Sequence, residues 1–300
     1  MKKFFVTFGD SRLKRSAGRI RRQAEAMGVY DRIVVANEYD LDSDFRERFK
    51  TRLIRGTRGF GCMCWKPQII LQVLDSMEEG DVLQYTDIGC HLNPQGLSRL
   101  HEYFQLVLQS PKGVLAFQHE RFTIPFKVTG GRSVTELIEC QWTKGDLLDY
   151  FGVRDRKDIM ATQQILSGLI FIRKCAESMD FVRQWQAPCL QDFAYIDDSP
   201  SKTPNVDGFI EHRHDQSIFS ILCKLNNIPT ISAREVDGFY HKMDSHSTPA
   251  WDVAMRHYPV QARHDKDFGI IWLCRIKVRN FINRILHRFF PSRAIPMGRW

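Results

Sequence analysis

The start of the chain constrains its fold more than any other stretch. Phe4–Phe8 is apolar enough for a buried strand, Leu13–Met27 has the pattern of a basic helix that ends near a glycine, and Arg32–Ala36 is a second apolar strand. A strand, a turn, a helix and a strand in this order predict a βαβ unit with a parallel strand pair. The predicted fold class is therefore α/β.

The turn after the first strand lies at the edge of such a sheet where ligands bind. It contains Gly9, Asp10 and Arg12, which we expect to contact a nucleotide. The alternative is a simple polar turn. The segment lacks a GxGxxG motif, so a dinucleotide is not indicated.

A third strand, Val82–Tyr85, runs directly into Asp87 within the segment GDVLQYTDIGCHLN. A carboxylate at the carboxyl end of a buried strand lies at the mouth of an open α/β sheet. Next to a diphosphate it needs a cation, and Mg²⁺ or Mn²⁺ held by carboxylate and phosphate oxygens fits such a site. The alternative is that Asp87 is a solvated turn residue.

Trp65 and Lys66 stand immediately before a predicted helix over Pro67–Met77. The amino terminus of a helix is a natural phosphate site, so these two side chains are candidates for donor binding. A buried tryptophan beside a lysine that reaches toward solvent is the alternative.

Two further predicted helices begin with polar residues. Glu211–Gln216 opens a helix with an apolar face, and Asp215 there could act on a substrate or complement the helix dipole. Thr143 is expected to cap another helix, with Asp146 placed as in a capping box.

The net charge of +8 is concentrated at the end of the chain. Residues 268–300 hold seven of the 43 Lys or Arg residues and no acid. The rest of the chain therefore has 36 basic residues against 35 acids. A near-neutral body argues against a nucleic-acid-binding face. Phe268–Phe290 reads as a basic amphipathic helix for an anionic membrane surface, or as a docked terminal helix with a solvated basic side.

The eight cysteines form no CxxC pair, and we expect most of them to be reduced, as in the cytosol. The apolar run at the start is too short for a signal peptide, and no uninterrupted apolar run approaches the length of a membrane-spanning helix. The predicted location is cytoplasmic, with peripheral association at the inner face of the membrane.

Five motifs occur in a fixed order along the chain. They are GxGxMxWKPxII at Gly59–Ile70, GDxLxYxDxGCxxN at Gly80–Asn93, WTKxDL at Trp142–Leu147, QxxxGxxFIRK at Gln164–Lys174 and HRHDQSIFSxLCK at His212–Lys224. In combination they resemble the bacterial nucleotide-sugar glycosyltransferases of the A-type fold that are encoded with capsule and O-antigen genes.

The resemblance implies one Rossmann-like domain over residues 1–266, followed by the tail at 267–300. It also implies a nucleotide-diphospho-sugar donor and Mn²⁺ or Mg²⁺. Asp87 matches the first acid of the family's DxD-type motif, whereas Gly89 stands where the second acid is usual. A further metal ligand would then come from His91, His241 or His246, and His241 is the one we assign.

Asp215 and Gln216 match an Asp-Gln pair found near the donor sugar in several retaining families, and we assign them as catalytic. Gln164, Gly168 and His214 are assigned to the sugar or the acceptor. The predicted function is transfer of a sugar, by a retaining or an inverting route, to a glycan or lipid-linked acceptor of a bacterial surface polysaccharide. The alternatives are a nucleotidyl- or phosphotransferase on the same scaffold and a non-enzymatic nucleic-acid-binding protein.

Overall fold

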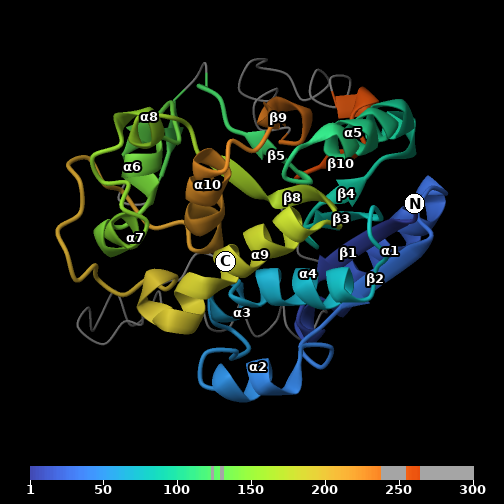
Figure 1. Ribbon diagram of the computed structural model, residues 1–300, viewed down its shortest axis with the longest axis horizontal. Helices are drawn as coiled ribbons and strands as arrows, with labels where there is room; N and C mark the ends of the chain where they lie inside the picture. The colour runs from blue at the N-terminus through green and yellow to red at the C-terminus, as the bar shows by residue number, and fades with distance from the viewer. Residues whose placement is uncertain (123–124, 129–131, 238–254, 264–300) are drawn as a thin grey trace, which may run out of the picture.

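The computed structural model describes residues 1–122, 125–128, 132–237 and 255–263. Its centre is a six-stranded sheet with the order β2-β1-β3-β8-β5-β9 (Figure 1). The strands are β1 (Lys3–Phe8), β2 (Arg32–Ala36), β3 (Val82–Thr86), β5 (Val114–Gln118), β8 (Ile165–Arg173) and β9 (Thr230–Ser232). The predicted α/β class is confirmed.

The first βαβ unit forms as expected. β1 pairs in parallel with β2, with Phe4 opposite Arg32 and Phe8 opposite Ala36, and α1 (Lys14–Met27) makes the crossover. The helix ends at Gly28, whose φ of 65° is the left-handed conformation that glycine adopts without strain. β1 also pairs in parallel with β3 on its other side.

The sheet contains one reversed strand. β8 runs antiparallel to both of its neighbours, β3 and β5, while β9 is parallel to β5. The first residues of β8 therefore lie at the same edge as the carboxyl ends of β3 and β5. The apolar run Leu169–Ile172 predicts a strand here but not its direction.

Helices cover both faces of the sheet and bury alternate side chains of its strands. Phe4, Val6 and Phe8 of β1 belong to the core under α4 (Trp65–Asp75), α9 (Ala176–Gln191) and α10 (Asp215–Leu225). Phe5 belongs to the core on the other face, under α1 and α5 (Leu97–Gln109). Figure 1 shows α9 packed beside both α4 and α10.

The remaining elements are short. The structure has helices α2 (Ser43–Arg48), α3 (Gly59–Cys62), α6 (Glu139–Trp142), α7 (Gly145–Tyr150) and α8 (Lys157–Met160), strand pairs β4–β10 (His91–Leu92 with Val260–Gln261) and β6–β7 (Phe126–Lys127 with Ser133–Val134), and the 3-10 turns Ser11–Leu13, Pro94–Gly96, Phe193–Tyr195, Ala233–Glu235 and Met255–His257. None of the described helices is long and apolar enough to cross a membrane.

Two predicted details are wrong. Thr143 does not N-cap a helix, because α7 begins two residues later with Lys144 at its N-cap. The Thr143 hydroxyl instead donates to Glu139 at 2.7 Å. The helix predicted from Pro67 begins at Trp65, so Lys66 lies inside its first turn. The seven cysteines within the described residues are all free, and Cys274 lies outside them.

Candidate active site at the carboxyl edge of the sheet

The strand order creates a switch point between β1 and β3. The chain leaves β1 toward β2 on one side, and β3 lies on the other, so the loops that follow β1 and β3 diverge at this edge. Ligands of open α/β sheets bind outside the carboxyl ends of strands at such a point. Asp87 follows β3 here, and its backbone N–H donates to the carbonyl of Gly168 in β8 at 2.8 Å.

A fully buried lysine joins two carboxylates at this edge. The Nζ atom of Lys66 lies 2.7 Å from Asp215 Oδ2 and 3.3 Å from Asp87 Oδ1. It also donates to the Oγ atom of Ser167 at 3.2 Å and to the Ser167 carbonyl at 3.3 Å. Lys66 therefore does not reach toward solvent, in contrast to the alternative considered for its sequence.

Asp215 is enclosed on the inner side of this cluster. Its side chain is 2% exposed, and Oδ2 also accepts from the Ser167 hydroxyl at 2.8 Å. The indole of Trp185 donates to the Asp215 carbonyl at 3.0 Å and fixes the start of α10. Asp215 is therefore the counter-ion of Lys66 as well as the first residue of its helix.

Asp87 forms the open side. Its side chain is 41% exposed, and Oδ1 accepts from the buried Tyr85 hydroxyl at 2.7 Å. A Cβ atom at Gly168 would stand 3.0 Å from Asp87 Oδ2, so glycine leaves room for the carboxylate. Tyr85 and Asp87 are two residues apart, where side chains of a strand share a face.

The charges of this cluster shift the pKa values of its members. Burial lowers the pKa of Lys66, but Asp215 and Asp87 together raise it above its usual value, so the ammonium stays protonated. Burial raises the pKa of Asp215, and Lys66 partly offsets that effect. Burial and the neighbouring Asp87 raise the pKa of Tyr85, which stays a hydrogen-bond donor. This cluster therefore has one cation and two acids.

In the first turn, the predicted donor-contact residues Asp10 and Arg12 pair with each other. Asp10 is buried and accepts from Arg12 Nε and Nη2, each at 2.7 Å. A Cβ atom at Gly9 would lie 2.2 Å from the Cδ1 atom of Ile88, so the turn after β1 packs tightly against the residue that follows Asp87. The structure thus brings this turn to the edge where Asp87 lies.

Trp65 lies in the core beside Lys66. Its ring stacks on Phe8 with centroids 3.9 Å apart, and its indole donates to the Gly59 carbonyl at 2.9 Å. It is 6% exposed, which matches the alternative of a buried tryptophan.

Two further predicted site residues, Gln164 and Gln216, belong to a second polar network. Gln216 Nε2 donates to Gln164 Oε1 at 3.0 Å, and Gln164 Nε2 donates to Glu139 Oε1 at 3.0 Å. Glu139 is fully buried and pairs with Lys224 Nζ at 2.6 Å. We define Glu139, Gln164 and Lys224 as the inner network.

The sequence interpretation missed Tyr85, Ser167, Glu139 and Lys224. Tyr85 and Ser167 lie within quoted motifs, and the two-residue spacing of Tyr85 and Asp87 was a usable signal. Glu139 had no comparable signal, because its partner Lys224 lies 85 positions away.

Only one of the histidines predicted as metal ligands, His91, lies within the described residues. His91 lies on β4, where its Nδ1 atom is 3.2 Å from Gln23 Nε2. His214, which was assigned to the sugar or the acceptor, lies beside Asp198, with Nε2 2.9 Å from Oδ1. His241 and His246 lie outside the described residues.

An Mn²⁺ or Mg²⁺ ion at Asp87 would have to bind one carboxylate oxygen, Oδ2, because Oδ1 already has protein partners. Oδ1 is engaged by Tyr85 and Lys66, while Oδ2 borders the space beside Gly168. The second acid, Asp215, is committed to Lys66. One carboxylate with phosphate oxygens and water can hold such an ion, so Asp87 fits as a single protein ligand.

Comparisons with known proteins give similarity only at the level of structure. No family model and no curated protein matches this sequence. Similar solved structures include a glycosyltransferase involved in glycosylation of the major capsid of PBCV-1, with 10% identity, TM-score 0.44 and coverage of 87% of this chain and 92% of that one.

Two others are the galactosyltransferase LgtC in complex with donor and acceptor sugar analogues (11% identity, TM-score 0.41, 86% of each chain) and mouse xyloside xylosyltransferase 1 (9% identity, TM-score 0.41, 87% of this chain and 96% of that one). TM-scores below 0.5 do not establish a shared fold. The function is therefore derived from the residues of the site.

Proposed function

We propose that this chain is a glycosyltransferase that moves a sugar from a nucleotide-diphospho-sugar to a glycan or lipid-linked acceptor of a bacterial surface polysaccharide. The observation that carries the proposal is the buried Lys66, which bridges Asp87 and Asp215 at the switch point of the sheet. The five ordered motifs of the sequence support it, since each charged member of this cluster belongs to one of them.

Asp87 is the group that meets the donor. It is the exposed carboxylate of the cluster, and its Oδ2 atom borders the room left by Gly168. Mn²⁺ or Mg²⁺ bound at Asp87 would neutralise the diphosphate and its developing charge as a leaving group. Tyr85 and Lys66 hold the carboxylate from the inner side.

Asp215 acts through Lys66 as a positioning residue. Its 2% exposure and its contacts with Lys66 and Ser167 turn its Oδ2 atom inward. It fixes the ammonium between the two acids, and the ammonium fixes Asp87. This differs from direct contact with the reacting sugar, which would require Asp215 to become accessible.

A screen of nucleotide-sugars identifies the donor. Thermal shift with and without Mn²⁺ should give stabilisation by one nucleotide-sugar, because a ligand that binds only the folded state raises its melting temperature. Product analysis should then find a glycosylated acceptor and a released nucleoside diphosphate. Release of pyrophosphate, or absence of stabilisation by every donor tested, would contradict the proposal.

A further inference from the structure

A second group of ligating side chains lies next to the candidate active site. Cys62, Asp198 and His214 come from three separate segments, and one ligating atom of each lies within 4.8 Å of the others. Within the described part of the chain, no other group of three or more His, Cys, Asp or Glu side chains lies this close together. Cys62 and His214 are buried, whereas the Asp198 side chain is 54% exposed.

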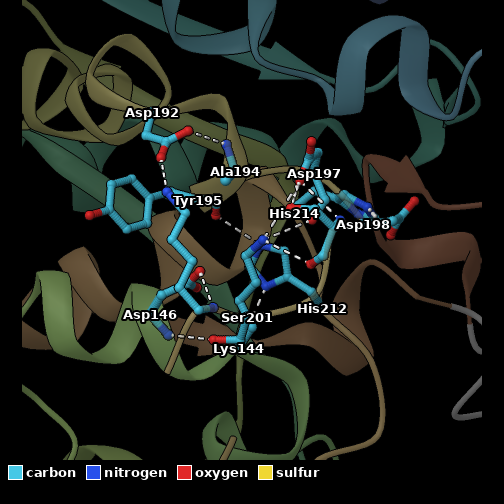
Figure 2. A network of polar contacts seen from close by, with 12 residues as sticks. Lys144, Asp146, Asp192, Ala194, Tyr195, Asp197, Asp198, Ser201, His212 and His214 are labelled. Carbon is cyan, nitrogen blue, oxygen red and sulfur yellow. Dashed lines mark hydrogen bonds and ion pairs between the residues drawn. The ribbon is translucent and has the colours of Figure 1, made fainter. Parts of the chain in front are cut away.

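The loop that carries Asp198 is held in place by the protein interior. Figure 2 shows Lys144 and His212 directed at this loop. Lys144 Nζ donates to the Asp197 carbonyl at 3.1 Å, and His212 Nε2 lies 3.1 Å from the Tyr195 carbonyl. Asp198 therefore faces His214 from a fixed position, with its Oδ1 atom 2.9 Å from His214 Nε2.

The two buried members of the group have an unusual backbone. Cys62 has a φ of 53° and His214 a φ of 56°, values that residues other than glycine adopt rarely and at an energetic cost. Cys62 belongs to a left-handed turn that runs from Gly59 to Met63, with every φ positive. Strain of this kind persists where the surrounding structure enforces it, and it is frequent at ligand-binding sites.

The chemistry of the three side chains suits a zinc ion. A thiolate, an imidazole and a carboxylate are all zinc ligands, with bond lengths of about 2.3, 2.0 and 2.1 Å. Tetrahedral coordination at these lengths separates the ligand atoms by about 3.4–3.6 Å, so the group needs only small shifts to close on an ion. Three protein ligands leave a fourth position for water on the exposed side of Asp198.

Catalysis by Cys62 as a nucleophile fits less well. Burial, together with the negative charges of Asp198, Asp197 and Asp215, raises the pKa of the Cys62 thiol to about 12. A protonated, buried thiol is a poor nucleophile, whereas a bound metal ion displaces its proton. The same carboxylates that disfavour the thiolate attract a cation.

We propose that Cys62, Asp198 and His214 bind a zinc ion that joins the segment before Lys66 to the start of α10. Cys62 lies four residues before Lys66 and His214 immediately precedes Asp215, so the ion would brace the two segments that carry the ion pair of the active site. Arg58, which now lies 3.3 Å from Asp198, gives up that contact when the ion binds. Each ion bound releases the thiol proton.

Cobalt and zinc binding to the full-length, metal-free protein tests this site without any sugar substrate. Co²⁺ should give a thiolate-to-metal charge-transfer band, and equimolar Zn²⁺ should abolish the band and raise the melting temperature. Cys62→Ser should lose the band, and Asp198→Asn should fold normally, because the side chain is half exposed, but bind at least about tenfold more weakly. Cys189→Ser, which removes another buried free thiol, should keep both the band and the shift.

Either of two results overturns the zinc site. One is the absence of a charge-transfer band in the wild type, and the other is a band of full strength in Cys62→Ser. Unchanged zinc affinity in Asp198→Asn would contradict the three-ligand arrangement. These readouts are independent of sugar transfer, so failure of the glycosyltransferase proposal would leave them interpretable.

Discussion

Two of the close lysine–carboxylate pairs among the described residues are largely buried, and they differ in whether the lysine is shared with an exposed acid. Lys224 pairs with Glu139 at 2.6 Å within the inner network, and Glu139 also accepts from the neutral side chains of Gln164 and Thr143. Lys66 pairs with Asp215 at 2.7 Å but is shared with a second acid, Asp87, that is 41% exposed. The first arrangement pairs one cation with one acid, whereas the second has two acids for one cation.

This difference separates a structural pair from a functional one. A buried ion pair is not by itself a sign of function, since replacing such a pair with apolar residues is often neutral for stability. The exposed acid of the second pair, Asp87, presents a carboxylate oxygen to solvent that the first pair lacks. We therefore expect the two pairs to respond alike in stability and differently in catalysis.

Replacing the lysines should have the largest effects. Lys66→Met and Lys224→Met each leave a buried carboxylate uncompensated, which costs about 3–5 kcal/mol of unfolding free energy. Lys66→Met should in addition lower the transfer rate per folded molecule by about 10²–10³, as expected for a lost charge-stabilising contact. Chemical denaturation and steady-state kinetics at permissive temperature measure the two effects.

Lys224→Met is the matched control for this comparison, and its transfer rate per folded molecule should be close to that of the wild type. Equal loss of activity in the two variants would mean that the inner network belongs to the catalytic machinery and that the distinction between the pairs is wrong.

Asp215→Asn should have the next largest effect. If Asp215 positions Lys66, its replacement should let the Lys66 ammonium move closer to Asp87. This should raise the KM for the donor more than it changes kcat. A carboxylate that contacts the reacting sugar would instead lower kcat by about 10²–10³. Kinetics at varied donor concentration distinguish the two, and a pure kcat defect would refute the positioning role.

The pH dependence of stability should differ between variants. Burial raises the pKa of Asp215 even beside Lys66, so removal of the lysine should raise it further. A carboxyl with a raised pKa contributes stability below its unfolded-state pKa and loses it as pH rises through the folded-state value. The stability loss of Lys66→Met should therefore be smaller at about pH 5 than at about pH 8.

The double variant Lys66→Met/Asp215→Asn carries no such carboxyl and should show a flatter pH profile between those two conditions. Thermal melts across the range provide the comparison. An equal loss of stability in Lys66→Met at both pH values would mean that the uncompensated charge is not on Asp215.

The smallest effect on chemistry is expected from the basic tail, because both buried pairs lie in the described body. Each basic residue near an anionic surface contributes about 1 kcal/mol of binding, screened by salt. Deletion of residues 268–300, which lie outside the described residues, should release the protein from anionic vesicles and keep turnover of a short water-soluble acceptor. Co-sedimentation at low and high salt measures binding, and unfolding of the truncated chain would show a docked helix instead.

Local features of the fold were predictable, and the long-range ones were not. The strands Arg32–Ala36 and Val82–Thr86 follow from short apolar runs bounded by turn residues, and the parallel pairing follows from the helix between the first two strands. The reversed direction of β8 has no local signature. Thr143 was misassigned because α7 begins at Gly145 with Lys144 at its cap, and the Thr143 hydroxyl donates to Glu139.

The candidate site shows the same division. Asp87 was placed at the sheet edge from its strand alone. Its link to Asp215 through Lys66 joins residues far apart in the chain, and only the folded structure reveals that one ammonium serves both. The left-handed turn at Gly59–Met63 contains two glycines, but Phe60, Cys62 and Met63 also adopt positive φ without being glycine, which the sequence does not signal.

Calorimetric titration of the donor identified by the screen into the wild type and Asp87→Asn, with Mn²⁺ present, tests the central claim most directly. Asp87 is partly exposed, so its exchange should cost at most about 1 kcal/mol of stability and leave the fold intact. We predict that affinity for the nucleotide-sugar falls at least about tenfold, because the donor diphosphate loses the carboxylate that holds its cation. Equal affinity in the two proteins, with both folded, would contradict a donor site at the Lys66–Asp87–Asp215 edge.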